Sequence, residues 1–137
     1  LEFREMLEIR CAELAAQRAR PADLAHLARA HDEVTAAYSS ADRSRQVQAD
    51  VAFHRAIADA TRNPVFKHLV GSLLELLHEH VLISIASLEA ESPDVRQLRR
   101  QHTRLFERIT AHDAAGAALA ARAHIAFVRR SWQQRLA

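Results

Sequence analysis

The stretch "ADVAFHRAIADATRNP", residues 49–64, follows the pattern of an amphipathic helix that ends just before the next helix begins. One stripe of this helix has positions alternating three and four apart, and it consists of Val47, Asp50, His54, Ile57 and Thr61. A stripe with this spacing normally faces the core of a protein. Two of its members are nevertheless a carboxylate and an imidazole, and such groups are costly to bury without partners.

The composition of the whole chain agrees with a helical protein. Its 137 residues are 49% hydrophobic and 26% charged, and they include only two glycines and three prolines. A sheet protein would need more β-branched residues and more turn glycines. We therefore predict an all-α fold, an antiparallel bundle of about six helices, in a single domain that covers residues 1–137.

Capping residues and prolines set the expected helix boundaries. The predicted ranges are 2–18, 21–38, 43–61, 64–88, 93–112 and 114–137. Asp42 and Asp113 are expected to cap two of these helices, and the pairs 63–64 (Asn-Pro) and 92–93 (Ser-Pro) are typical helix starts.

Two of the predicted helices carry clear apolar patterns. The inner face of the first is predicted to contain Phe3, Leu7, Cys11, Leu14 and Arg18. The helix over 64–88 is the most apolar, with an inner face of Leu69, Leu73, Leu76, Leu77, Val81 and Ile85. This helix is expected either to cover a cavity or to form an interface.

Charge and cysteine content exclude several classes of protein. The net charge is +2, and acidic residues are interspersed among the basic ones. The chain alone is therefore expected to bind nucleic acid poorly. The single Cys11 excludes an internal disulfide and is compatible with a cytoplasmic location, which we expect. No apolar run approaches the roughly 18 residues of a membrane span. The chain begins with Leu within a helical pattern, so we expect a fragment of a longer protein.

Two further histidines interrupt apolar stripes. His102 lies on the stripe of Leu98, Leu105 and Ile109, and His124 lies on that of Ala117, Ala121 and Val128. Together with Asp50 and His54, they place four potential ligands on the inward faces of three helices. Bundles build metal sites from side chains on facing helices in this way. The set fits Zn, Ni, Mn or Fe at about 2.0–2.2 Å, with positions left for water or an oxygen-bearing ligand.

Simpler interpretations exist for each of these residues. A single inward histidine can bond to a backbone carbonyl, and Asp50 can pair with a nearby arginine. Arg4 and Glu8, four apart on the first helix, are interpreted as a surface ion pair. His78 and His80 are two apart, so they are expected on different faces of a helix. Four other histidines have no partner at ligand spacing, and we expect solvated or interface positions for them: His26, His31, His68 and His112.

Three segments resemble the FCD domain, the C-terminal effector domain of FadR-type regulators in the GntR family. Residues 49–64 are similar to its D-x-x-F-H…N signature. Residues 101–125, "QHTRLFERITAHDAAGAALAARAHI", resemble its H-x-x-[IL]…A-I-x-x-x-D…A…H-[IL] tail, although "R-I-T-A-H" replaces the expected A-I before Asp113. Residues 4–19, "REMLEIRCAELAAQRA", are similar to its first helix, R-x-x-L-E…A-x-L-A-A.

This resemblance implies a function for the four inward residues. In the metal-binding branch of the family, the matching positions, here Asp50, His54, His102 and His124, hold a metal. A small carboxylate effector then completes its coordination, helped by an arginine on the first helix, for which Arg4 is the candidate and Arg10, close by in sequence, is the alternative. The resemblance also implies a homodimer. It places DNA binding in an N-terminal winged helix-turn-helix domain that this sequence lacks.

The leading hypothesis is therefore an effector-sensing domain of a transcription regulator, not an enzyme. One alternative is a metal-dependent enzyme, since a metal with open positions can activate water. Against it, Asp59 and Glu107 lie off the ligand stripes, and no other obvious general base is present. The other alternative is a helical interaction module whose inward polar groups merely satisfy one another.

Overall fold

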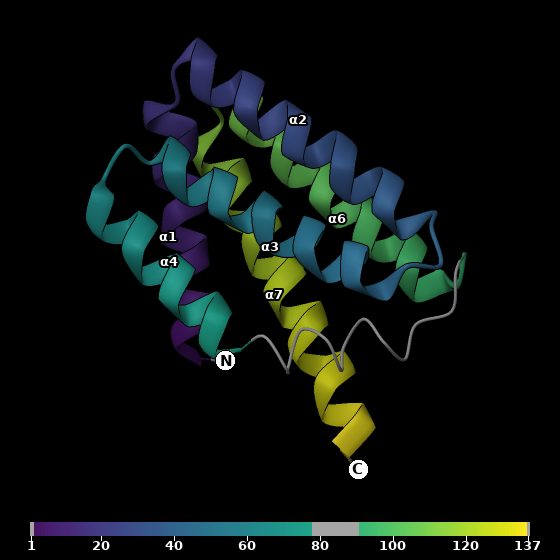
Figure 1. Cartoon of the computed structure of the whole chain (residues 1–137). Helices are drawn as coiled ribbons and strands as arrows, with labels where there is room; N and C mark the ends of the chain where they lie inside the picture. Colours follow the sequence, from purple (N-terminus) through teal and green to yellow (C-terminus); the bar gives the residue numbers. More distant parts are fainter. Residues whose placement is uncertain (1, 78–90, 137) are drawn as a thin grey trace.

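The computed structural model describes residues 2–77 and 91–136, and within these ranges it is an all-α protein without strands (Figure 1). The six described helices are α1 (Glu2–Arg18), α2 (Pro21–Tyr38), α3 (Arg43–Ala60), α4 (Pro64–Leu76), α6 (Pro93–Thr110) and α7 (Ala114–Leu136). The predicted fold class is therefore confirmed.

Side-chain caps begin four of these helices at the predicted positions. The Asp42 carboxylate accepts a hydrogen bond from the backbone N–H of Arg45 at 3.1 Å, and the Asn63 side chain accepts one from Val65 at 2.9 Å. Ser92 caps α6 in the same way, and Asp113 caps α7. Each cap satisfies an N–H group that has no partner within its own helix.

Helix α3 contains most of the stretch 49–64 and lies between other helices in the core. It packs against α1, α2 and α4, while α1 also packs against α4, α6 and α7. The pairs α2–α3, α3–α4 and α6–α7 contact each other across short loops, as consecutive helices in an antiparallel bundle do. Figure 1 shows α2 lying along α6, with the last part of α7 extending past the other helices.

The buried face of α1 differs from the predicted one. Phe3 is 53% exposed and Arg18 is also exposed, whereas Leu7, Cys11 and Leu14 are buried as predicted. Buried residues that the apolar pattern did not include are Arg4, Glu8, Ala12, Ala15 and Ala16. The covered side of α1 therefore includes small alanine side chains and the Arg4–Glu8 pair, and it does not include Phe3.

Helix α4 also presents a different face to the core. Its buried residues are Val70 and Leu74, whereas Leu69 is 37% exposed and Leu76 is 81% exposed. The apolar residues of α4 therefore occupy both its inner and its outer side. Within the described residues α4 ends at Leu76, and the remainder of the predicted helix, including Val81 and Ile85, lies outside them.

Candidate metal centre

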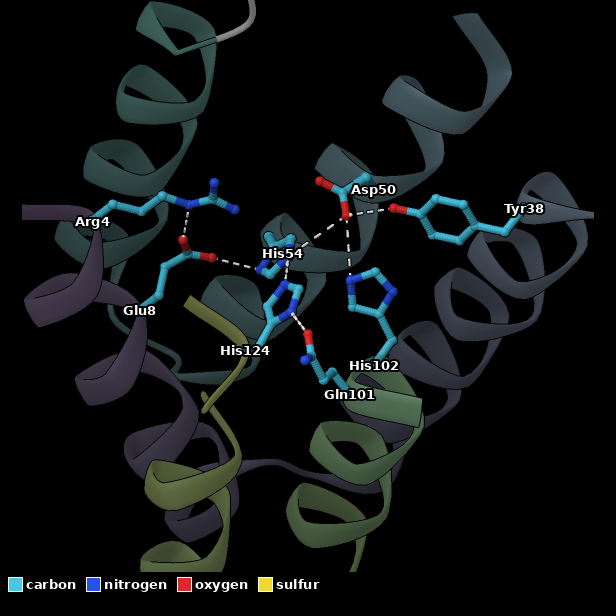
Figure 2. Close-up of polar contacts among 8 residues, drawn as sticks. All are labelled: Arg4, Glu8, Tyr38, Asp50, His54, Gln101, His102 and His124. Carbon is cyan, nitrogen blue, oxygen red and sulfur yellow. Dashed lines mark hydrogen bonds and ion pairs between the residues drawn. The ribbon is translucent and has the colours of Figure 1, made fainter. Parts of the chain in front are cut away.

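Three histidines from three helices meet in the core of the bundle. His54 comes from α3, His102 from α6 and His124 from α7, and none is more than 4% exposed. One ring nitrogen from each lies within 4.8 Å of the others. Nε2 of His54 is 3.3 Å from Nε2 of His124 (Figure 2).

Asp50 adjoins this cluster from the same helix as His54. Its Oδ1 lies 3.3 Å from Nε2 of His102 and 3.8 Å from Nε2 of His54. The Tyr38 hydroxyl from α2 donates a hydrogen bond to the same oxygen at 3.4 Å. The structure thus brings together all four residues that the helical stripes singled out.

The outer nitrogens of two histidines are held by side chains that the sequence analysis did not assign to the site. Nδ1 of His54 donates to Oε1 of Glu8 at 2.5 Å, and Nδ1 of His124 donates to Oε1 of Gln101 at 2.7 Å (Figure 2). A proton on Nδ1 leaves Nε2 of a neutral imidazole as an acceptor that faces the cluster. Such outer partners are a regular feature of histidine ligands to metals.

Arg4 holds the other oxygen of Glu8. Its Nε donates to Glu8 Oε2, and the two residues are 2% and 6% exposed. The prediction of a surface ion pair was therefore wrong: the pair lies in the core beside His54. Its spacing of four residues was visible in the sequence, but the pattern did not reveal that this side of α1 is covered.

The surroundings set the charges of these groups. Burial lowers the pKa of His102, and it lowers that of His124 well below the ordinary value, which favours their neutral forms. Burial also opposes a charged His54, but Glu8 outweighs this effect and raises its pKa. Burial by itself would raise the pKa of the Asp50 and Glu8 carboxyls, yet the facing histidines and Arg4 lower both.

The donor set fits a metal ion. In the neutral state with the proton on Nδ1, the inner nitrogens of His54 and His124 would be acceptors, and together with the Asp50 oxygen they converge on one region. Two atoms bound at about 2.1 Å to one ion lie about 3.0–4.2 Å apart, and the separations of 3.3 and 3.8 Å fall within that range.

His102 provides an independent argument for this fit. It is 1% exposed, and although its Nε2 lies 3.3 Å from Oδ1 of Asp50, neither ring nitrogen makes a hydrogen bond of acceptable geometry among the described residues. A buried polar group without a partner costs about 1–3 kcal/mol. An ion bound by Nε2 of His102 would remove part of that cost.

A small cavity adjoins the histidines. Its lining includes Glu8, Cys11, His54, Ala121 and His124. About 10 Å³ is open to the centre of a water-sized sphere, which is room for roughly one water molecule. In this arrangement the cavity is too small for an organic acid.

The other described histidines lie outside the cluster. His26 and His68 are exposed, and His26 lies 3.6 Å from Asp59. His31 stacks on Phe106 with a ring separation of 4.7 Å, and Nδ1 of His112 bonds to the carbonyl of Ala16 at 2.9 Å. None of these four is among the groups of described residues that could hold a metal.

Comparison with known proteins gives a consistent picture. The FCD domain family matches residues 1–127. The HTH-type transcriptional regulator LutR of Bacillus subtilis (strain 168) is 36% identical over 129 residues, covering 91% of this chain and 57% of LutR. The putative L-lactate dehydrogenase operon regulatory protein of Escherichia coli (strain K12) is 35% identical over 128 residues, covering 93% of this chain and 48% of that protein.

Solved structures agree with these sequence relatives. The structure of Streptococcus agalactiae GntR superposes with a TM-score of 0.75 at 26% identity, covering 95% of this chain and 56% of that one. The chain thus spans about half the length of the relatives it matches. LutR is named as a transcriptional regulator and the Escherichia coli relative as an operon regulatory protein, which agrees with the prediction of a regulator. In the part of the chain that the structure describes, no helix is long and apolar enough to cross a membrane.

Proposed function

The chain belongs to the FCD-domain family of GntR-type transcription regulators, and we propose that it senses a small carboxylate through a metal ion in its core. The ion would be held by Asp50, His54, His102 and His124. The observation that carries this proposal is the convergence of buried ligand atoms from α3, α6 and α7, with no hydrogen bond of acceptable geometry at either nitrogen of His102 among the described residues.

A divalent ion would add positive charge at the point where the Asp50 oxygen and the histidine nitrogens converge, and it would give an organic anion a site of attachment. The oxygen and nitrogen ligands suit Zn, Ni, Mn or Fe. Glu8 and Gln101 would keep two of the imidazoles oriented, as their hydrogen bonds do already.

The carboxylate would lie beside the ion and near Arg4. The Arg4 guanidinium is a buried cation on α1, whereas the proposed ligands belong to α3, α6 and α7. Its Nε donates a hydrogen bond to Glu8. One relative is named for the L-lactate dehydrogenase operon, and L-lactate is a small 2-hydroxy acid of the kind that a metal and an arginine can bind together.

The small size of the cavity indicates how binding of an organic acid would change the arrangement of the helices. Because the cavity that the described residues line has room for only about one water, an organic acid would bind there better in an arrangement in which the helices lie further apart. Such a ligand shifts the population toward that arrangement. In a full-length regulator, the shift would change the positions of DNA-binding domains, which would make the contacts to DNA.

We also propose that the chain acts as a homodimer. Of the six large apolar side chains that are exposed among the described residues, five lie on α1 and α4, which pack against each other. They are Phe3, Met6, Val65, Leu69 and Leu76. Exposed apolar side chains that gather on one surface commonly mark a contact between subunits, and we propose that these side chains form such a contact.

If the chain is instead a helical interaction module without a metal, its core histidines must be satisfied by a proton in place of an ion. A proton shared between His54 and His124 would satisfy those two rings without an ion, and the raised pKa of His54 favours that state. It would still leave both nitrogens of His102 without acceptable hydrogen bonds among the described residues. The metal therefore explains more of the site than the proton does.

Elemental analysis of the purified chain tests the proposal. We expect about one equivalent of a transition metal in the natural sequence and almost none in the variant with His102→Ala and His124→Ala. The matched control carries His26→Ala and His68→Ala, which removes two exposed histidines and should retain the metal. If the natural chain takes up no metal even after reloading with Zn²⁺, Ni²⁺, Mn²⁺ or Fe²⁺, the proposal is wrong.

A further inference from the structure

The buried carboxylate of Glu8 accepts hydrogen bonds from two different side chains, one at each oxygen. Its Oε1 accepts from Nδ1 of His54 at 2.5 Å, and its Oε2 accepts from Nε of Arg4 (Figure 2). Both oxygens are therefore in use, and the side chain is 7% exposed. We propose that Glu8 is a positioning residue that fixes His54 for metal binding and links it to Arg4. This inference rests on the proposed metal site.

The three histidines differ in the group that their Nδ1 contacts. This difference indicates that Glu8 has a larger effect on His54 than the corresponding groups have on the other two. Nδ1 of His124 bonds to the neutral amide of Gln101 at 2.7 Å, and Nδ1 of His102 has no acceptable hydrogen bond among the described residues. His54 alone of the three donates Nδ1–H to a carboxylate. A carboxylate makes a stronger hydrogen bond than an amide and makes the imidazole a better electron donor at Nε2.

A glutamine could not replace Glu8 in this arrangement. A carboxylate accepts hydrogen bonds at both oxygens, whereas an amide has one oxygen that accepts and one nitrogen that only donates. With glutamine at this position, either Nδ1–H of His54 or Nε–H of Arg4 would face a donor. The substitution would also remove the buried negative charge beside the buried guanidinium of Arg4.

The location of Glu8 on α1 adds a functional consequence. The four proposed ligands belong to α3, α6 and α7, and Glu8 is the contact through which α1 reaches one of them. Arg4, the residue proposed to meet the organic acid, lies one turn away on the same helix and bonds to the same carboxylate. A change at Arg4 would thus reach His54 through the hydrogen bonds of Glu8.

The test compares Glu8→Gln with Glu13→Gln, both on α1. Glu13 pairs with Arg10 at the surface and does not contact the cluster. Zn²⁺ affinity is measured by competition with a chromophoric chelator, and the stability of the metal-free proteins is measured by urea denaturation. We expect Glu8→Gln to weaken Zn²⁺ binding about 10–100-fold, as loss of an outer partner typically does, and Glu13→Gln to change it less than about twofold.

Nitrogen-15 NMR of the Zn²⁺-loaded natural chain provides a second measurement that needs no folded variant. His54 should be bound through Nε2 and should keep its proton on Nδ1. A chain that binds Zn²⁺ with His54 protonated on Nε2 would overturn the role of Glu8 and leave the metal site standing. The same holds if Glu8→Gln loses stability but keeps its Zn²⁺ affinity. A natural chain that binds no Zn²⁺ or other transition metal overturns both proposals.

Discussion

At the scale of single residues, Cys11 shows how strongly the core excludes solvent. The thiol is 2% exposed, it lines the small cavity, and burial together with the charge of Glu8 raises its pKa to about 12. At pH 8 only about one thiol in ten thousand would be ionised, and the thiolate is the reactive form. We expect iodoacetamide to label Cys11 very slowly in the folded chain and rapidly in urea, as measured by mass spectrometry.

The pH dependence of this labelling follows from the sign of the shift. The pKa is raised, so the thiol stays neutral through pH 8 and ionises only as the pH approaches 12. Rapid labelling near neutral pH would mean that the cavity opens far more often than its size of about one water indicates.

The four proposed ligands could be identified from the sequence because each interrupts an otherwise apolar helical stripe. Asp50 and His54 are one turn apart, and the stripes of His102 and His124 contain mainly leucine, isoleucine or alanine. Glu8 could not be identified in the same way. An acidic and a basic residue four apart give the same pattern on a surface as in a core, and only the packing of α1 against α3, α6 and α7 distinguishes the two.

At the scale of helices, the two glycines of the chain form a natural comparison. A methyl group added at Gly71 in α4 would lie 3.3 Å from the guanidinium of Arg55, which is the end of a flexible side chain. One added at Gly116 in the first turn of α7 would lie 2.2 Å from Oδ2 of Asp113, the capping residue of that helix. Alanine is favoured over glycine in helix interiors by about 0.5–1 kcal/mol.

We therefore expect Gly71→Ala to raise the free energy of unfolding by up to about 1 kcal/mol. Gly116→Ala should lower it by about 1 kcal/mol, because the Asp113 cap must move and lose its bond to the backbone. Urea denaturation measures both variants under the same conditions. Equal effects of the two substitutions would show that helix propensity alone decides, and that the Asp113 cap contributes little.

Helix starts were more predictable than helix faces, for a physical reason. A cap such as Asp42 or Asn63 depends on a few neighbouring residues, so the sequence contains all the information needed. The inner face of α1 or α4 depends on which helices pack around it. In α4, apolar residues occupy both the face formed by Val70 and Leu74 and the opposite side, and periodicity could not tell which one is buried.

At the scale of the whole molecule, the exposed apolar side chains of α1 and α4 test the proposed dimer. We expect the variant with Met6→Glu and Leu76→Glu to be monomeric at concentrations where the natural chain is a dimer. An important interface residue contributes about 2 kcal/mol, or roughly a 30-fold change in the dissociation constant. Sedimentation equilibrium measures the change.

Leu119→Glu on α7 is the matched control for this experiment. Leu119 is 67% exposed, comparable to Met6 at 71%, but it belongs to α7 and not to α1 or α4. The control should remain dimeric. If Leu119→Glu dissociates the dimer and the α1–α4 variant does not, the contact between subunits lies on the α7 side of the molecule.

Metal and organic acid should stabilise the molecule together, since the proposed site uses the ion to hold the acid. A ligand at 100 times its dissociation constant stabilises the folded state by about 2.7 kcal/mol, which for a chain of this size raises Tm by about 10 °C. We expect small 2-hydroxy acids such as L-lactate to raise Tm only when Zn²⁺ is bound. The matched amides, such as L-lactamide, lack the carboxylate and should have no effect.

Thermodynamic linkage adds a second requirement, because the coupling free energy between two bound ligands is reciprocal. An acid that binds more tightly in the presence of Zn²⁺ must tighten Zn²⁺ binding by the same factor. Differential scanning fluorimetry with each ligand alone and with both gives the two factors independently. An acid that stabilises the metal-free chain as much as the Zn²⁺-loaded chain would show that Arg4 or another cation holds it without the metal. The ion would then have a structural role in the bundle and no part in sensing the acid.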